Sequence, residues 1–228
     1  MRAAPEGAGR QTSSSARLPV PCLMLITDRR IAGSAGALVD AVAEAVEGGV
    51  TAVQLREKDL PPEELLPLAR LLRAVTRNQA AFILNGPLEV ALAAEADGVH
   101  LPENAVMVER PQRPFLIGRS VHSLEAAERA RAERSDYLIA GPIFETASHP
   151  DATPAGLGLI ASTAGAVAVP VLAVGGITDR RVRDVVRVGA SGVAVISSIL
   201  SAQSPGRAAQ ALRTELDEAW TATGRRCD

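Results

Sequence analysis

The stretch GRSVHSLEAA, residues 118–127, joins a predicted strand directly to a predicted helix. Its first half ends an aliphatic run typical of a buried strand, and its second half begins an amphipathic helix after Ser123. The same order recurs along the chain, so the sequence predicts eight strand–helix units. The predicted strands are 22–27, 52–56, 81–85, 98–101, 115–121, 137–141, 171–175 and 192–196, and two of the predicted helices are 62–77 and 124–134.

Eight such units that close on themselves predict an α/β fold, a single-domain (β/α)₈ TIM barrel. The composition agrees, because 47% hydrophobic residues with only 2% aromatics suit buried parallel strands and closely packed helices. An open doubly wound sheet is the alternative, but it would expect fewer strands and a glycine-rich loop after the first one, where none follows Thr27. We expect a flexible N-terminal arm over residues 1–19, the barrel over 20–222 and a C-terminal tail over 223–228.

Charge and hydropathy narrow the class of protein. The formal net charge is −2, which leaves no broad basic field for nucleic acid or an anionic membrane surface. No apolar run approaches the roughly 18 residues of a membrane span, and residues 1–19 lack the apolar middle of a signal peptide, so we expect a cytoplasmic protein. Cys22 and Cys227 lack metal-ligand spacing and receive no role. A homodimer is compatible with the alanine-rich helices, although the sequence does not identify an interface.

Polar residues cluster where the predicted strands end. Barrel enzymes bind their ligands at this end, because the loops there surround the open mouth above the packed interior. Side chains two residues apart on a strand share a face, so Gln54, Arg56 and Lys58 point the same way, as do Ser120 and His122. The predicted substrate-binding residues are Arg56, Lys58, Asn85, Ser120 and Thr146.

His122, one of three histidines, has two interpretations. It could be a cap or packing residue, with Glu125 or Glu128 pairing with its imidazolium. It could instead carry a proton, since an imidazole titrates near neutrality. His100 has the same alternatives, while His149 lies in a polar loop and is expected to be solvated.

Lys58 is the only lysine among 24 basic residues. A lone lysine indicates a position where a compact point charge, such as one facing a phosphate, suits better than a guanidinium. The alternative is a surface residue paired with Glu57 or Asp59. The functional interpretation is favoured because Arg56 lies on the same face.

The last two strands predict a phosphate site. In many barrels the loops after strands seven and eight hold a phosphate through backbone N–H groups, and glycine lets the backbone approach the ligand. The ligand indicated is a small phosphate ester. The predicted phosphate-binding residues are Gly175, Gly176, Ser197 and Ser198. Motifs for zinc peptidases, P-loop nucleotide hydrolases, α/β-hydrolases and dithiol chemistry are absent from the sequence.

Several segments together are specific to one superfamily. They are QLREKD (54–59), ADGVHLP (96–102), GRSVHSLEAA (118–127), YLIAGPIFET (137–146) and VLAVGGIT (171–178). Through them the chain resembles the thiamine phosphate synthase and TenI superfamily of barrels over nearly the whole predicted barrel.

The resemblance leaves two branches to separate. The synthase branch joins a pyrimidine diphosphate to a thiazole phosphate, and its pattern has an Asn-Asp pair after strand three, an acidic residue after strand four and a Thr-x-Thr-Lys loop after strand six. The aspartates hold Mg²⁺ against the diphosphate. Here Gly86 follows Asn85, Glu103 is the only acidic residue at the second place, and the loop reads TASH over 146–149. We therefore predict no metal and no cofactor.

The TenI branch, thiazole tautomerase, resembles this sequence more closely at those places. The resemblance implies an isomerase that aromatises a carboxythiazole phosphate by proton transfer, with His122 as general acid and base. We predict this function in thiamine biosynthesis, with a thiazole phosphate as the small-molecule substrate. The alternatives are a thiamine phosphate synthase with an altered metal site and a non-catalytic thiazole-phosphate-binding regulator.

Overall fold

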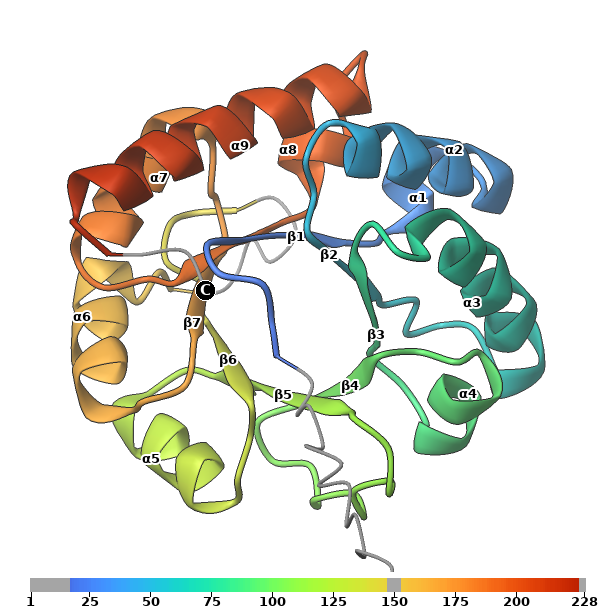
Figure 1. Ribbon diagram of the computed structural model, residues 1–228, viewed down its shortest axis with the longest axis horizontal. Helices are drawn as coiled ribbons and strands as arrows, with labels where there is room; N and C mark the ends of the chain where they lie inside the picture. The colour runs from blue at the N-terminus through green and yellow to red at the C-terminus, as the bar shows by residue number, and fades with distance from the viewer. Residues whose placement is uncertain (1–16, 147–152, 226–228) are drawn as a thin grey trace, which may run out of the picture.

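The computed structural model describes residues 17–146 and 153–225, which form a closed parallel barrel with helices around its outside (Figure 1). The strands run in chain order, and β1 pairs with β8, which closes the sheet and excludes the open doubly wound alternative. The predicted single-domain TIM barrel is confirmed. The strands are β1 Cys22–Ile26, β2 Ala52–Leu55, β3 Ala81–Leu84, β4 Gly98–Leu101, β5 Leu116–Val121, β6 Tyr137–Ala140, β7 Val171–Val174 and β8 Gly192–Val195.

Helices follow the other strands as the periodicity predicts, but the prediction of eight strand–helix units is wrong after β4, because residues 102–115 form a loop that leads directly to β5. At the junction in GRSVHSLEAA, Ser123 caps α5 by accepting a hydrogen bond from the Ala126 N–H at 3.1 Å, so strand passes into helix within two residues. The short helices α1 and α8 were not predicted, because four residues show no periodicity. The helices are α1 Arg29–Ala32, α2 Ala35–Glu47, α3 Pro62–Thr76, α4 Leu88–Ala93, α5 Leu124–Ala132, α6 Gly156–Ala166, α7 Asp179–Arg187, α8 Ser197–Leu200 and α9 Pro205–Ala222.

Alternating residues of the strands build two cores. On β1, Cys22, Met24 and Ile26 belong to the cluster that fills the barrel interior, while Leu23 and Leu25 pack outward under the helices. Burial raises the pKa of the Cys22 thiol to about 12, so this cysteine is a packing residue.

The segment before β1 crosses the opening of the barrel in Figure 1, and Leu18 joins the interior cluster with 6% of its surface exposed. Leu18 thus covers the amino-terminal end of the interior, although it falls within the range predicted as a flexible arm. Residues 1–16 of that arm, and Cys227 in the predicted tail, lie outside the described residues.

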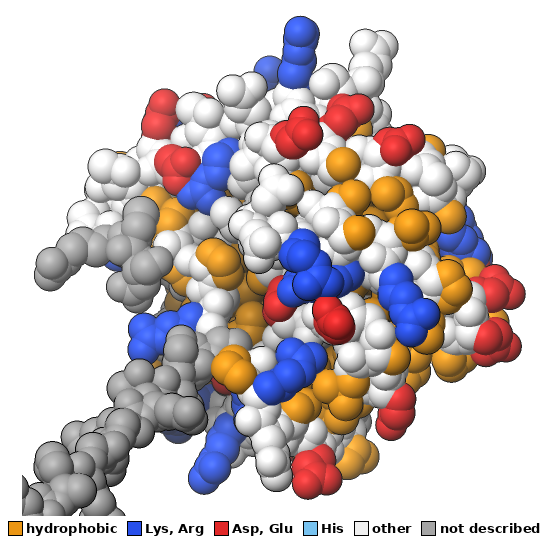
Figure 2. Space-filling view, turned by 45° about the vertical axis from the view of Figure 1, so that its right-hand side comes forward, with side chains coloured by type: hydrophobic (Ala, Val, Ile, Leu, Met, Phe, Trp, Pro, Cys, Tyr) orange, Lys and Arg blue, Asp and Glu red, His pale blue; other side chains and the backbone are white. Residues whose placement is uncertain are grey.

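The outer surface mixes charges of both signs. Figure 2 shows basic and acidic side chains next to one another on one side of the molecule, with hydrophobic side chains between them. In the described ranges, none of the helices has the length and apolar character needed to cross a membrane.

Candidate active site

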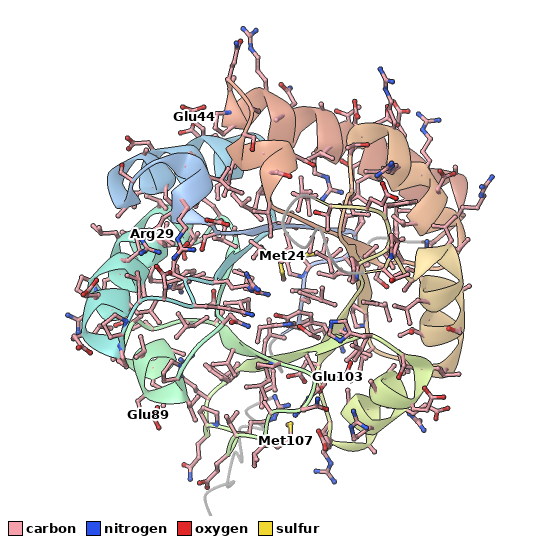
Figure 3. The ribbon with its side chains drawn as sticks, turned by 180° about the vertical axis from the view of Figure 1, so that it is seen from behind. Met24, Arg29, Glu44, Glu89, Glu103 and Met107 are labelled. Atoms are coloured by element: carbon pink, nitrogen blue, oxygen red, sulfur yellow. The ribbon has the colours of Figure 1, made fainter. Side chains whose placement is uncertain are left out.

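A pocket of about 330 Å³ lies at the carboxyl ends of the strands. In Figure 3, Met24 lies near the centre of the barrel and Glu103 lies farther out, toward α5, while Glu44 and Glu89 lie on the outer helices. The structure brings every predicted site residue to this one pocket, which their places at the strand ends explain. The pocket is lined by His122, Arg56, Lys58, Asn85, Ser120, Thr146, Gly175, Gly176, Ser197 and Ser198, among others.

Two cations lie side by side in the pocket. Arg56 follows β2, where burial lowers the pKa of its guanidinium, and the charge of Arg56 in turn lowers the pKa of Lys58. Among the described residues, neither side chain forms a salt bridge. The pair therefore raises the positive potential at one wall of the pocket, which an anionic ligand would relieve.

The two acids beside Lys58 are engaged elsewhere. Arg29 binds both, at 2.7 Å from Nη2 to Asp59 Oδ2 and at 3.1 Å from Nη1 to Glu57 Oε2. Glu57 also accepts a hydrogen bond from the Thr27 hydroxyl at 2.7 Å. The proposed pairing of Lys58 with Glu57 or Asp59 is therefore wrong, and Lys58 faces the pocket instead.

His122 lies at the rim, with 60% of its side chain exposed. Its Nδ1 is 2.7 Å from Glu103 Oε2, and the same oxygen accepts a hydrogen bond from the His122 backbone N–H at 2.8 Å. The carboxylate thus fixes the ring and leaves Nε2 for a ligand. The partner comes from the loop after β4 and is neither Glu125 nor Glu128.

His100 is buried and is one of the residues that line the pocket. Its Nε2 lies 2.9 Å from Ser120 Oγ, and its Nδ1 lies 3.2 Å from Tyr137 Oη. Burial, reinforced by the charges of Arg56 and Arg119, lowers the pKa of His100 from 6.5 to about 3. The imidazole is therefore neutral at physiological pH and does not serve as a proton carrier there.

The neutral state of His100 predicts a pH dependence of stability. Below pH 6.5 the imidazole of the unfolded chain takes up a proton, whereas the folded one, with a pKa of about 3, stays neutral, so stability falls with falling pH. Between pH 6.5 and 4.5 this group should lower the free energy of unfolding by about 2–3 kcal/mol. Urea unfolding of the protein and of His100→Gln at both pH values checks this, because only the parent chain carries this loss. Equal losses in the two proteins would contradict it.

The loops after β7 and β8 form another wall of the pocket. Gly175 and Gly176 have φ values of 94° and 64°, which favour glycine, and a Cβ on Gly175 would lie 2.6 Å from Pro142 Cβ. The Ser198 hydroxyl donates its proton to the Ile177 carbonyl, so the backbone N–H is the donor that Ser198 can offer to an anionic ligand. The first turn of α8 leaves the N–H groups of Ser197 and Ser198 without intrahelical acceptors. These groups can together receive a phosphate.

The sequence does not identify Glu103 as the partner of His122 or Tyr137 as a neighbour of the pocket. Both contacts depend on the barrel. The first joins the loops after β4 and β5, 19 residues apart in the sequence, and the second joins β4 to β6 across β5, 37 residues apart. Tyr137, the only tyrosine of the chain, carries one usable signal, since a polar aromatic residue inside a buried strand requires a hydrogen-bond partner.

The donor set does not fit a magnesium site of the kind that the synthase pattern implies. The described residues bring together no group of three His, Cys, Asp or Glu side chains that could hold a metal ion. Asn85 donates its amide to the His100 carbonyl at 3.1 Å, and Glu103 is held by His122 and lies 3.7 Å from Arg129. Among the described residues, Glu103 is thus the one carboxylate that lines the pocket, and it already has cationic or N–H partners.

Comparison with known proteins gives a consistent result. The family model described as thiamine monophosphate synthase matches residues 23–199. The thiamine-phosphate synthase of Methanoculleus marisnigri is 43% identical over 200 residues, covering 85% of this chain and 94% of the relative. The solved thiamine phosphate pyrophosphorylase from Pyrococcus furiosus is 37% identical, with a TM-score of 0.76, covering 87% of this chain and 96% of that one.

These relatives correct the predicted activity. Their names are those of a synthase, which is a transferase, so the prediction of a thiazole tautomerase, an isomerase, is wrong. The prediction rested on the histidine after strand five together with one missing magnesium carboxylate. That inference fails physically, because a pocket with adjacent cations and a phosphate-receiving wall suits substrates of both kinds and does not single out proton transfer. The fold, the pocket and the comparisons agree that the chain belongs to the thiamine monophosphate synthase family.

Proposed function

We propose that the protein is a thiamine-phosphate synthase, a transferase that joins a pyrimidine diphosphate to a thiazole phosphate and releases pyrophosphate. The observation that carries the proposal is the pair Arg56 and Lys58, two neighbouring cations in one pocket without a salt-bridge partner among the described residues. A diphosphate supplies the two or more negative charges that such a pair would bind. The names of the relatives support the same activity.

The two walls of the pocket suggest separate roles for the two substrates. The diphosphate would lie against Arg56 and Lys58, whose charges stabilise the leaving pyrophosphate as the bond to the pyrimidine breaks. The phosphate of the thiazole would lie at Gly175, Gly176 and the first turn of α8. Holding both ligands in one pocket would bring the thiazole nitrogen to the methylene carbon attached to the pyrimidine ring, where the bond to nitrogen forms as the bond to the pyrophosphate oxygen breaks.

A coupled assay tests the proposal. The full chain is incubated with pyrimidine diphosphate and thiazole phosphate, and thiamine phosphate and pyrophosphate are measured with Mg²⁺ and with a chelator. We expect the two products in a 1:1 ratio. No product under either condition would overturn the proposal, and affinity for thiazole phosphate without turnover would favour the non-catalytic binder.

The roles of the site residues in this reaction are part of the proposal. We also propose that the protein forms a homodimer and is located in the cytoplasm. Sedimentation of the purified chain would test the first of these.

A further inference from the structure

Arg181 contacts two of the loops that line the pocket, although it does not line the pocket itself. It lies in the first turn of α7, and its Nη1 donates a hydrogen bond to the Gly176 carbonyl at 2.7 Å. Its Cζ lies 4.5 Å from the centroid of the Phe144 ring, which belongs to the loop after β6. The guanidinium therefore connects the loop after β6 with the loop after β7.

The backbones of these two loops also meet at this place. β6 and β7 are neighbours in the barrel (Figure 1), and beyond their ends the Phe144 N–H donates to the Gly175 carbonyl at 3.1 Å. A Cβ on Gly176 would collide with the Glu145 carbonyl oxygen and would lie 3.0 Å from Arg181 Nη1, so glycine is needed there. These neighbours do not line the pocket, and this side of Gly176 thus faces away from it.

The held carbonyls set the directions of the next backbone N–H groups. Both peptides are trans, and in a trans peptide the C=O and the N–H point to opposite sides. Phe144 holds the Gly175 carbonyl, so the Gly176 N–H points away from Phe144. Arg181 holds the Gly176 carbonyl, so the Ile177 N–H points away from Arg181. Both N–H groups belong to residues that line the pocket, and within the described ranges neither has a hydrogen-bond acceptor.

The same contacts reduce the repulsion that an anion would meet at this wall. A backbone carbonyl oxygen carries partial negative charge, and one without a donor would repel a phosphate. The oxygens of Gly175, Gly176 and Ile177 each accept a hydrogen bond, the last from a serine hydroxyl. Arg181 supplies the one charged donor of the three, and a hydrogen bond from a charged donor is the stronger kind.

We propose that Arg181 is a positioning residue for the phosphate site, which holds the Gly176 peptide so that the Ile177 N–H faces the phosphate of the substrate. Its guanidinium acts from behind the loop and does not touch the ligand, because it lies outside the pocket. The effect is specific to the phosphate group, since the rest of the substrate does not meet this N–H. The identity of the ligand as a thiazole phosphate rests on the proposed function, whereas the direction of the N–H does not.

Calorimetric titration of the full chain measures the consequence for binding. Arg181→Met is expected to weaken binding of thiazole phosphate about tenfold, because the Ile177 N–H is no longer held in place. The affinity for the same thiazole without its phosphate should change by no more than about twofold. Equal losses for the two ligands would indicate that Arg181 only supports the shape of the pocket, and no loss for either would show that the N–H keeps its direction without it. Both results would overturn the proposal.

Three comparisons separate the hydrogen bond from the charge of Arg181. Arg180→Met removes a cation from the neighbouring position of α7, which is exposed and outside the pocket, so the affinity should change by no more than about twofold. Arg181→Lys should stay within about threefold of the parent, because a single bond to a carbonyl does not need the guanidinium fork. The ratio of affinities between the parent and Arg181→Met should be the same at low and high salt. A ratio that falls to one at high salt would indicate long-range charge and contradict the positioning role.

Backbone amide NMR of the full chain tests the direction of the N–H itself. We expect the amide proton of Ile177 to move downfield when thiazole phosphate binds to the parent chain, and to move much less in Arg181→Met at saturation. An Ile177 amide that does not respond in the parent would overturn the inference even if the chain is an active synthase. The expected responses in a chain that forms no thiamine phosphate would support it and count only against the proposed function. Absence of binding by the parent would overturn both.

Discussion

Gly118→Ala is expected to lower the free energy of unfolding by about 3 kcal/mol, the upper range for overpacking a core. The added Cβ would overlap the ring of Tyr137, which lies inside a closed barrel and has no free space to move into. For a chain of this length, such a loss corresponds to a fall in Tm of roughly 6–12 °C, which a thermal unfolding scan measures.

Gly158→Ala is the matched control for this change. Gly158 lies in α6, and an added Cβ would meet nothing within 4 Å. Alanine there should be neutral or stabilise the protein by up to about 1 kcal/mol, since it favours the helix. The double variant Gly118→Ala with Tyr137→Val should recover part of the lost stability, because the overlapping ring is gone. An unchanged Tm for Gly118→Ala would show that the barrel interior tolerates the methyl group.

Arg56→Met and Lys58→Met are each expected to weaken binding of inorganic pyrophosphate by about 10- to 100-fold, the value of a hydrogen bond from a charged group. Both side chains line the pocket, and each raises the potential that the other presents to an anion. Arg56→Met should also raise the pKa of Lys58 toward its ordinary value, because the repulsion is removed. Calorimetric titration with pyrophosphate measures the affinities.

Two control variants separate the effect of the charges in the pocket on pyrophosphate affinity from the effect of the overall charge of the protein. Arg30→Met removes a cation that binds Asp59, is 74% exposed and does not line the pocket, so it should change the affinity by no more than about twofold. Lys58→Arg keeps the charge and should stay within about fivefold of the parent. If both methionine variants bind pyrophosphate as tightly as the parent chain, the cation pair does not hold the anion.

Most of the fold could be predicted from the sequence, because apolar runs and helical periodicity are local signals. Six of the predicted strands, such as 22–27, extended one residue too far at the carboxyl end, where the last residue already belongs to the loop, and the predicted strand 115–121 began one residue early. Burial on both faces makes the strands easy to recognise, but the ends depend on where the hydrogen-bond ladder stops.

The site could be predicted as a set of residues but not as a network. His122, Lys58 and Ser120 lie at the ends of predicted strands, and they line one pocket because the barrel topology places all those ends together. The partners were not predictable, since Glu103 and Tyr137 come from other strands or loops whose register and loop geometry set the contacts. The activity was misjudged because the absence of one aspartate carries less information than the similarity of the whole barrel.

The filling of the barrel interior, in which Leu18 takes part, has a kinetic consequence. With side chains filling the barrel below the pocket, small molecules can enter and leave only through the mouth between the strand ends. When two substrates occupy this pocket together, the one nearer the mouth blocks the path of the other. Two-substrate turnover through a single entrance should therefore follow a compulsory order.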